Sequence, residues 1–376
     1  MGTRPDSTDG GRSMDEEAAR TTPAGSARLR AVAQGPVLAA AAVILVWWRS
    51  GPRLLPYLDA FVADAQSWPD TVLAPDQRFI LFSPLGQLTY QALGGGGKYP
   101  FLAEHLAAGA LAFVLLLAVL RRAVGPASGW VGWRLVVLGP LGAVLVSWLG
   151  SYDAYTVLAW AAFLLLWSLA GRWGLVLGGV LLGVQNFEQG FVGMLALTLL
   201  WIVFRDDAPR LRLAANPAWA FIGVVAGRLA LQGYFLVRGV EGGRGRLEWL
   251  TPDVVTENLT STVRALPLYV FSIVGGLWVM LWLLRSRVDG HRNRALLACA
   301  FAIPFAAGAI AVDHTRVFTM STVPALVLLV VVFLDGEMDA RRRRLAEVAV
   351  WLTVPIILWG DEVWAFGLHN SLGPFG

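Results

Sequence analysis

The sequence predicts an all-α, polytopic integral membrane protein with about eleven transmembrane helices. Three observations support this fold class. Hydrophobic residues make up 56% of the 376 positions, and the mean hydropathy is +0.60. Only 15% of the residues are charged, well below the roughly 25% of an ordinary soluble domain. The 17 tryptophans suit a protein with two membrane interfaces, where indole rings anchor.

The chain divides into a tail and one membrane domain. Residues 1–27 are polar, rich in Gly, Ser and Thr with mixed charge, which predicts a disordered tail. Residues 28–376 form a single helical domain with a long first outer loop at about 49–100. Its apolar runs lie at 33–48, 101–120, 132–149, 155–170, 173–186, 190–204, 217–237, 265–284, 295–312, 317–334 and 346–365. Most runs approach the roughly 17–25 residues that cross the hydrocarbon core as helix, but three neighbouring ones, from 155 to 204, are short and could be tilted or re-entrant.

Arginine placement predicts the orientation. With the N-terminus inside, 20 of the 30 basic residues fall in inner segments and 9 in outer ones, while Arg228 lies within a span. Every short inner loop then carries arginine, as the positive-inside rule requires, and the C-terminus lies outside. The single Lys98 against 29 arginines is typical of a GC-rich, bacterial genome. We therefore expect a multi-pass protein of the bacterial cytoplasmic membrane.

Several protein classes are disfavoured. The calculated pI near 9.6 would suggest a nucleic-acid partner in a soluble protein. Here the arginines stand in short loops between apolar runs, so orientation in the membrane explains them and no nucleic-acid partner is expected. The single Cys299 excludes an internal disulfide framework. Walker A, Rossmann, zincin and nucleophile-elbow motifs do not occur.

Four compact polar motifs stand at the expected outer ends of helices. They occupy residues 57–64, 150–153, 185–189 and 313–316. Because the adjoining loops are short, most of these groups should lie at the depth of the outer interface. Carboxylates are costly there unless they meet a cation, a metal or a substrate.

The first motif holds two candidate catalytic carboxylates, Asp59 and Asp64. On a helix, a separation of five residues places two side chains about 140° apart. Both carboxylates would therefore not face one point, and one could serve a site while the other faces solvent. The alternative is that both are solvated loop residues.

The densest motif contains Asp313, His314 and Arg316. A guanidinium binds oxyanions through two parallel hydrogen bonds, so Arg316 would suit a phosphate. The alternative is that Asp313 and Arg316 pair as anchors at a helix end. We assign all three as candidate substrate-binding residues.

Three further residues complete the candidate substrate-binding set. Asp153 precedes an apolar run, so it could act in a site or as a helix N-cap. Glu188 could act in a site or join helices through hydrogen bonds. Arg228 lies in the middle of a span, where an arginine is a site candidate unless a buried acidic partner neutralises it.

The order of these features resembles the GT-C superfamily of membrane glycosyltransferases, which use polyprenyl-phosphate-linked sugars. In that family the first span leads into a long outer loop that bears the catalytic aspartate, and here Asp59 and Asp64 stand at that place. Residues 82–86, running into 99–101 and the second span, look like the family's approach to its second helix. The resemblance covers mainly residues 33–120, and the chain lacks the large C-terminal soluble domain of many members.

This resemblance implies transfer of a sugar from a polyprenyl-phosphate donor to a glycan or lipid acceptor at the outer face. Asp59 or Asp64 would take the proton of the acceptor hydroxyl, and Arg316 with Arg228 would stabilise the leaving phosphate. Carboxylates could hold a divalent metal, although no spacing indicates one and the cofactor stays unknown. Two alternatives stay open: a non-catalytic membrane component of an envelope assembly, and a transporter or flippase.

Overall fold

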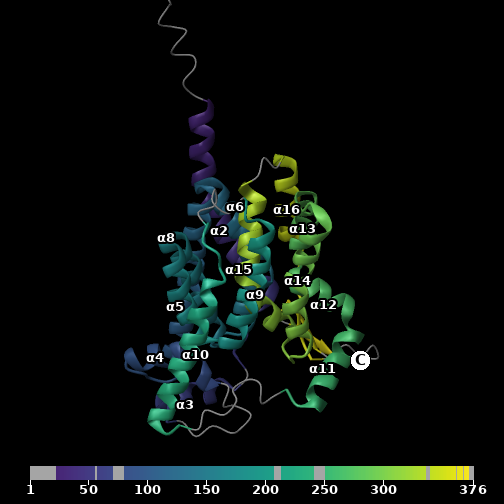
Figure 1. Ribbon diagram of the computed structural model, residues 1–376. Coiled ribbons are helices and arrows are strands. Elements are labelled where there is room, and N and C mark those ends of the chain that lie inside the picture. The colour runs from purple at the N-terminus through teal and green to yellow at the C-terminus, as the bar shows by residue number, and fades with distance from the viewer. Residues whose placement is uncertain are drawn as a thin grey trace, which may run out of the picture.

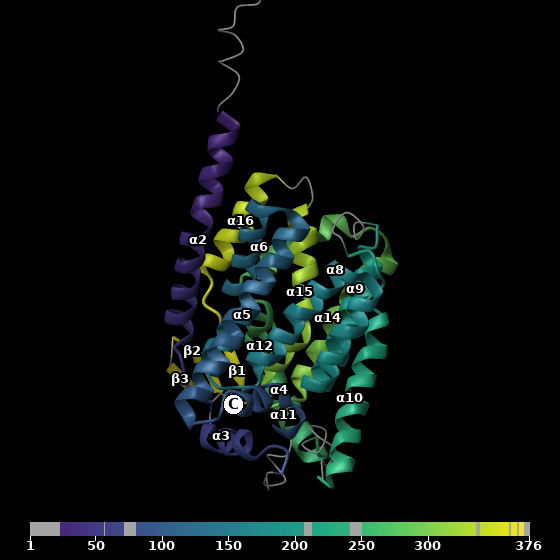
Figure 2. The same ribbon diagram turned by 90° about the vertical axis from the view of Figure 1, so that its left-hand side faces the viewer.

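The computed structural model describes residues 23–55, 57–70, 80–206, 213–240, 250–335, 339–360, 362–366 and 368–371. They form one bundle of helices with a small sheet on its side (Figures 1 and 2). This confirms the predicted all-α class. The helices are α2 Pro23–Ser50, α3 Leu58–Ser67, α4 Pro84–Ala92, α5 Lys98–Val124, α6 Pro126–Leu138, α7 Pro140–Ser147, α8 Asp153–Gln185, α9 Phe187–Val203, α10 Trp219–Arg238, α11 Pro252–Arg264, α12 Leu266–Val274, α13 Leu277–Leu284, α14 Gly290–Ala309, α15 His314–Asp335 and α16 Ala340–Leu352.

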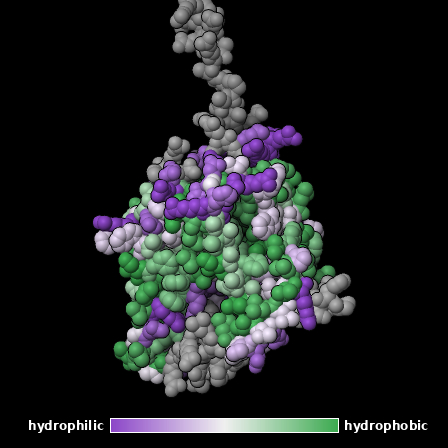
Figure 3. Space-filling model, turned by 45° about the vertical axis from the view of Figure 1, so that its right-hand side comes forward, coloured by the Kyte–Doolittle hydropathy of each residue, from purple (hydrophilic) through white to green (hydrophobic). Residues whose placement is uncertain are grey.

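Four of these helices, α5, α8, α10 and α15, are long and apolar enough to cross a membrane. The count rises to six if the pairs α6–α7, bent by 52°, and α12–α13, bent by 82°, each form one span. By this measure the described residues hold fewer spans than the eleven expected from the sequence. On the face seen in Figure 3, an apolar band crosses the middle of the bundle, with hydrophilic residues towards both ends. This surface fits contact with a lipid bilayer.

Helix α8 folds back on itself at Gly171, whose φ of 55° and ψ of −128° lie outside the helical region. A Cβ atom on Gly178 would lie 2.8 Å from Phe163 Cα, although 15 residues of straight helix would span about 22 Å. At the open end, Gln185 Nε2 donates to the carbonyl oxygen of Tyr152 at 3.3 Å. The apolar runs on either side of Gly171 therefore lie side by side, and both ends of α8 reach the same end of the bundle.

Glycines allow α8 and α10 to approach closely. A Cβ atom on Gly179 or Gly183 would collide with backbone of α10, and one on Gly223 or Gly227 would collide with backbone of α8. Each helix thus presents two glycines four residues apart to the other, the spacing with which membrane helices pack backbone against backbone. This contact fixes α10, and Arg228 with it, against α8.

The central helix is α15. All of its residues from His314 to Leu334 are buried except Val317, which is half-buried. An apolar helix that is buried on every side belongs to the centre of a bundle. Its N-terminal turn, which carries the motif at 313–316, therefore lies inside the protein at one end of the bundle.

The last apolar run does not form the expected helix. Helix α16 ends at Leu352, and the chain continues through residues 353–356 into β1 Ile357–Trp359, β2 Glu362–Ala365 and β3 Leu368–Ser371. These strands form one antiparallel sheet in the order β1-β2-β3. The prediction of a helical span over 346–365 is therefore wrong, because Gly360, at φ 55°, turns the chain and the strands pair with each other.

The sheet is joined to the end of the first long helix. The Arg49 guanidinium donates to the carbonyl oxygens of Trp351 and of Thr353, the latter at 3.0 Å. The backbone N–H of Phe366 donates to the Arg49 carbonyl oxygen at 2.6 Å. At the start of the chain, α2 begins at Pro23, so residues 23–27 of the expected tail are helical and the rest of that tail lies outside the described residues.

Candidate functional site

Arg316, in the first turn of α15, joins two carboxylates from distant parts of the chain. Its Nε donates to Asp153 Oδ2 at 2.5 Å, and its Nη1 donates to Asp313 Oδ2. Nη2 lies 3.5 Å from Ser151 Oγ, which itself donates to Asp153 Oδ2 at 2.9 Å. We call Asp153, Asp313 and Arg316 the Arg316 cluster.

The Arg316 cluster is largely inaccessible to solvent. Arg316 is 7% exposed and Asp153 is 1% exposed, whereas the Asp313 side chain keeps 22% of its surface. Burial raises the pKa of the Asp313 carboxyl above its ordinary value, and the adjoining Arg316 charge opposes this rise. Because removing one partner would leave a buried charge without its counter-ion, these three residues depend on one another.

The interpretation of Asp153 as an N-cap is wrong. Asp153 is the first residue of α8, and the residue before it, Tyr152, makes no side-chain cap. Instead, the Asp153 backbone N–H donates to Ser151 Oγ at 3.3 Å. The Asp153 carboxylate is therefore left to pair with Arg316. The alternative that Asp313 and Arg316 pair at a helix end is confirmed in part, because the two side chains do form an ion pair.

His314 and Thr315 bind the neighbouring segments. His314 Nδ1 lies 2.9 Å from the carbonyl oxygen of Gly308; a carbonyl only accepts, so Nδ1 donates in this bond. Thr315 Oγ1 accepts from the backbone N–H of Leu358 in β1 at 3.0 Å. The Val312 carbonyl accepts from Gly360 N at 2.7 Å. The small sheet thus holds Asp313 and the first turn of α15, which carries Arg316.

Arg228 has an acidic neighbour, Glu188, with Nη2 and Oε1 4.0 Å apart. Its guanidinium also lies 4.1 Å from the ring centre of Phe82 and 5.5 Å from that of Phe187. Glu188 is thus the acidic partner that the sequence could not identify. Because Phe82 precedes α4, this contact ties the segment between α2 and α5 to α9 and α10.

The two aspartates of the segment between α2 and α5 differ in exposure. Both lie on α3, where Asp59 is exposed and Asp64 is buried. Asp64 Oδ2 accepts from Gln87 Nε2 of α4 at 3.2 Å. Phe61 on the same helix stacks on Tyr152, with ring centres 6.4 Å apart. Helix α3 therefore packs beside the Arg316 cluster, and Asp59 is the carboxylate it leaves accessible.

The structure brings the four polar motifs to one end of the bundle. The Leu85 N–H donates to Gln185 Oε1 at 3.0 Å, and Gln185 also donates to the Tyr152 carbonyl. Asn186 Nδ2 donates to Thr156 Oγ1 at 3.2 Å. The motifs form neighbouring clusters joined by these bonds, and the partner residue Gln87 gave no signal in the sequence beyond being polar.

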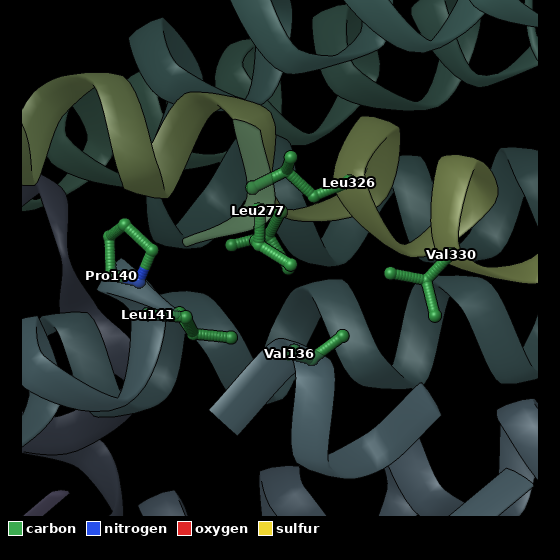
Figure 4. A pocket seen from close by; sticks show the side chains of 7 residues that line it. Val136, Pro140, Leu141, Leu277, Leu326 and Val330 are labelled. Atoms are coloured by element: carbon green, nitrogen blue, oxygen red, sulfur yellow. The ribbon is translucent and has the colours of Figure 1, made fainter. Parts of the chain in front are cut away.

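In the part of the chain that the structure describes, no group of three or more His, Cys, Asp and Glu side chains is placed to hold a metal ion. A pocket elsewhere in the bundle, at the break between α6 and α7, offers no polar side chain to a substrate (Figure 4). Its labelled lining residues are Val136, Pro140, Leu141, Leu277, Leu326 and Val330. The groups that could carry chemistry are therefore those described above, around Arg316, around Arg228 and on α3.

No protein-family model, curated protein or solved structure matches this chain. The function must accordingly be argued from its own residues. The arrangement offers an exposed carboxylate, Asp59, on the helix whose Phe61 packs against Tyr152, and a buried guanidinium, Arg316, held by two carboxylates. These groups could accept a proton and stabilise a negative charge, respectively.

Proposed function

We propose that the chain is a membrane glycosyltransferase-like protein that transfers a sugar from a polyprenyl-phosphate donor to a glycan or lipid acceptor. The reaction takes place at the outer face of the bacterial cytoplasmic membrane. One observation carries the proposal: Asp59 is exposed in the first turn of α3, and α3 packs against Tyr152 beside the Arg316 cluster. A solvent-accessible carboxylate thus lies on the helix that packs against Tyr152, whose ring also contacts Arg316.

In the proposed step, Asp59 accepts the proton of an acceptor hydroxyl while that oxygen forms a bond to the anomeric carbon of the sugar. The bond from this carbon to the phosphate oxygen breaks, and the lipid phosphate leaves with the electron pair. Arg316 stabilises the phosphate by releasing Asp313, the more exposed of its two carboxylate partners, and binding the phosphate in its place. Arg228 is the second candidate cation. Asp64, which is held by Gln87, positions α3 against α4.

The proposal includes a topology of eleven passages, with the N-terminus in the cytoplasm and the C-terminus outside. The two arms of α8 count as two passages, each bent pair as one, and α16 with residues 353–356 as the last. Two features support it: α16, whose first turn carries Arg341 to Arg344, lies at one end of the bundle, and α3 and α4 lie at the other (Figures 1 and 2). The positive-inside rule then assigns the arginine-rich end to the cytoplasm.

Cysteine labelling tests this orientation. Cys299 is replaced by serine, and single cysteines are placed at Ser67 in α3 or at Ser286 after α13, both exposed positions. In intact cells an impermeant maleimide should label Ser67→Cys and leave Ser286→Cys unlabelled until the cells are opened. If only Ser286→Cys were labelled in intact cells, the protein would have the opposite orientation to the one proposed.

Two asparagine variants test the chemistry. Asp59→Asn keeps the shape of the side chain but removes its basicity, so transfer should fall by about 10²–10⁴-fold. Asp64→Asn is the matched control on the same helix, and transfer by it should fall far less. Membranes are supplied with polyprenyl-phosphate-linked hexoses or pentoses, and sugar transfer is compared at equal protein level. Full transfer by Asp59→Asn would exclude Asp59 as the base.

A second function, a non-catalytic component of an envelope assembly, is favoured by the pairing of the buried charges. Arg316 pairs with Asp153 and Asp313, and Arg228 lies beside Glu188, so protein groups already neutralise one another. If this second proposal holds, Asp59→Asn should complement a deletion strain as well as the parent protein. Under the enzyme proposal the same variant should fail to complement it at normal membrane levels.

A further inference from the structure

Two buried polar atoms beside Arg316 have no hydrogen-bond partner in the described residues: Trp148 Nε1 and Asp153 Oδ1. Trp148 is 4% exposed and Asp153 is 1% exposed. The bonds from Arg316 and Ser151 do not satisfy Asp153 Oδ1, because both of them end on Oδ2. Buried polar groups in proteins are normally satisfied, so each exception requires an explanation.

The two residues that carry these atoms both lie next to the Arg316 guanidinium. Arg316 Nε contacts Asp153 at 2.5 Å, and Arg316 Cζ lies 5.9 Å from the ring centre of Trp148. The Trp148 ring is held in place, since it stacks on Trp364 at 5.1 Å and meets Trp359 edge-on at 5.0 Å. Both the donor and the acceptor are therefore fixed before any ligand arrives.

The chemistry of the two atoms selects the class of ligand. An indole N–H only donates, and an ionised carboxylate only accepts. An ammonium group cannot accept from Trp148, and a fully ionised phosphate cannot donate to Asp153. A hydroxyl group does both. Two more buried hydroxyls without a described partner, Ser50 Oγ and Ser147 Oγ, stand at the adjoining ends of α2 and α7, and they add groups that suit a polyhydroxylated ligand.

We propose that Trp148 and Asp153 form a sugar-hydroxyl subsite beside Arg316. Trp148 Nε1 donates to a hydroxyl oxygen of the sugar, and Asp153 Oδ1 accepts from a hydroxyl group of the same sugar. The ligand reaches them past Asp313, which keeps the largest exposed fraction of the three charged residues in the cluster. The subsite deepens the proposed function and rests on it, because it assigns these residues to the sugar that the donor carries.

The test measures sugar binding by the full-length protein, independently of transfer. Purified protein in detergent is titrated with methyl glycosides of common hexoses and pentoses, and the melting temperature is recorded. The glycoside that stabilises the parent protein should bind about tenfold more weakly to Trp148→Phe, which loses one donor but keeps an aromatic ring. Trp160→Phe is the matched control, because Trp160 Nε1 already donates to the Met320 carbonyl. It should bind the glycoside like the parent.

A second variant, Ser147→Ala, removes one buried hydroxyl with little change in volume and should weaken binding while leaving the melting temperature of the free protein unchanged. Equal binding by the parent, Trp148→Phe and Ser147→Ala would overturn the subsite. The subsite would also be overturned if no glycoside stabilised the parent and an experimental density map showed only ordered water on Trp148 Nε1 and Asp153 Oδ1. Asp59→Asn separates the two proposals: weakened binding by Trp148→Phe but not by Asp59→Asn supports the subsite, even if Asp59→Asn transfers sugar normally.

Discussion

Replacing Gly178 by alanine tests the reversal of α8 at Gly171. The new Cβ would lie 2.8 Å from Phe163 Cα, whereas ordinary contacts begin at 3.4 Å, so the two arms must move apart by about 0.6 Å. Phe163 is fully buried, and such overpacking costs about 1–3 kcal/mol. Alanine also raises helix propensity by about 1 kcal/mol. Gly178→Ala should therefore be neutral to destabilised by about 2 kcal/mol.

Gly233→Ala in α10 is the matched control. It gains the same helix propensity, but its Cβ meets no atom within 4 Å, so it should be stabilised by about 1 kcal/mol. The propensity contribution cancels between the two variants. The free energy of unfolding of Gly178→Ala should therefore be about 1–3 kcal/mol lower than that of Gly233→Ala. Thermal unfolding of the purified protein in detergent gives the comparison. Equal melting temperatures would mean that Gly178 and Phe163 are not in contact, and the hairpin would be refuted.

Two buried contacts elsewhere give further predictions. Arg134→Met breaks the ion pair of the buried Arg134 with the part-buried Glu347 and should cost about 1–3 kcal/mol. Adding Glu347→Leu should restore most of the melting temperature, and no recovery would count against the pair. Thr315→Val leaves the buried Leu358 N–H without its acceptor and should cost about 1–3 kcal/mol. Thr319→Val, one turn along, removes a buried hydroxyl without a described partner and should be neutral or stabilising, so equal losses would refute the assignment.

The helical parts of the fold were readable because apolar periodicity and loop arginines leave a clear pattern. The break between 170 and 173 was visible as two short runs, and Gly171 supplies the left-handed conformation that the reversal requires. The C-terminal sheet was missed because its segment is as apolar as a span. The Gly360-Asp361 pair between aromatic and β-branched residues was the available signal for a hairpin.

The candidate site was predictable in its members but not in its pairing. Short loops were enough to place Asp153, Glu188 and Asp313 at one end of the protein. That Asp153 shares Arg316 with Asp313, across 163 positions, depends on how α8 and α15 pack, which no local pattern encodes. Likewise, helical geometry separated Asp59 from Asp64, but only the position of α4 shows that Gln87 holds Asp64.

The bond between Arg49 and the segment after α16 bears on how the protein is made. Arg49 leaves the ribosome about 300 residues before its acceptors at Trp351 and Thr353, and Thr315 leaves it before the strand that binds it. Loop-closing contacts of such long range form late in folding. Asp313 and the first turn of α15 thus gain their β1 support only after residues 357–359 have been synthesised. A nascent chain that stops before residue 357 would insert its helices but leave this end of the bundle unfinished.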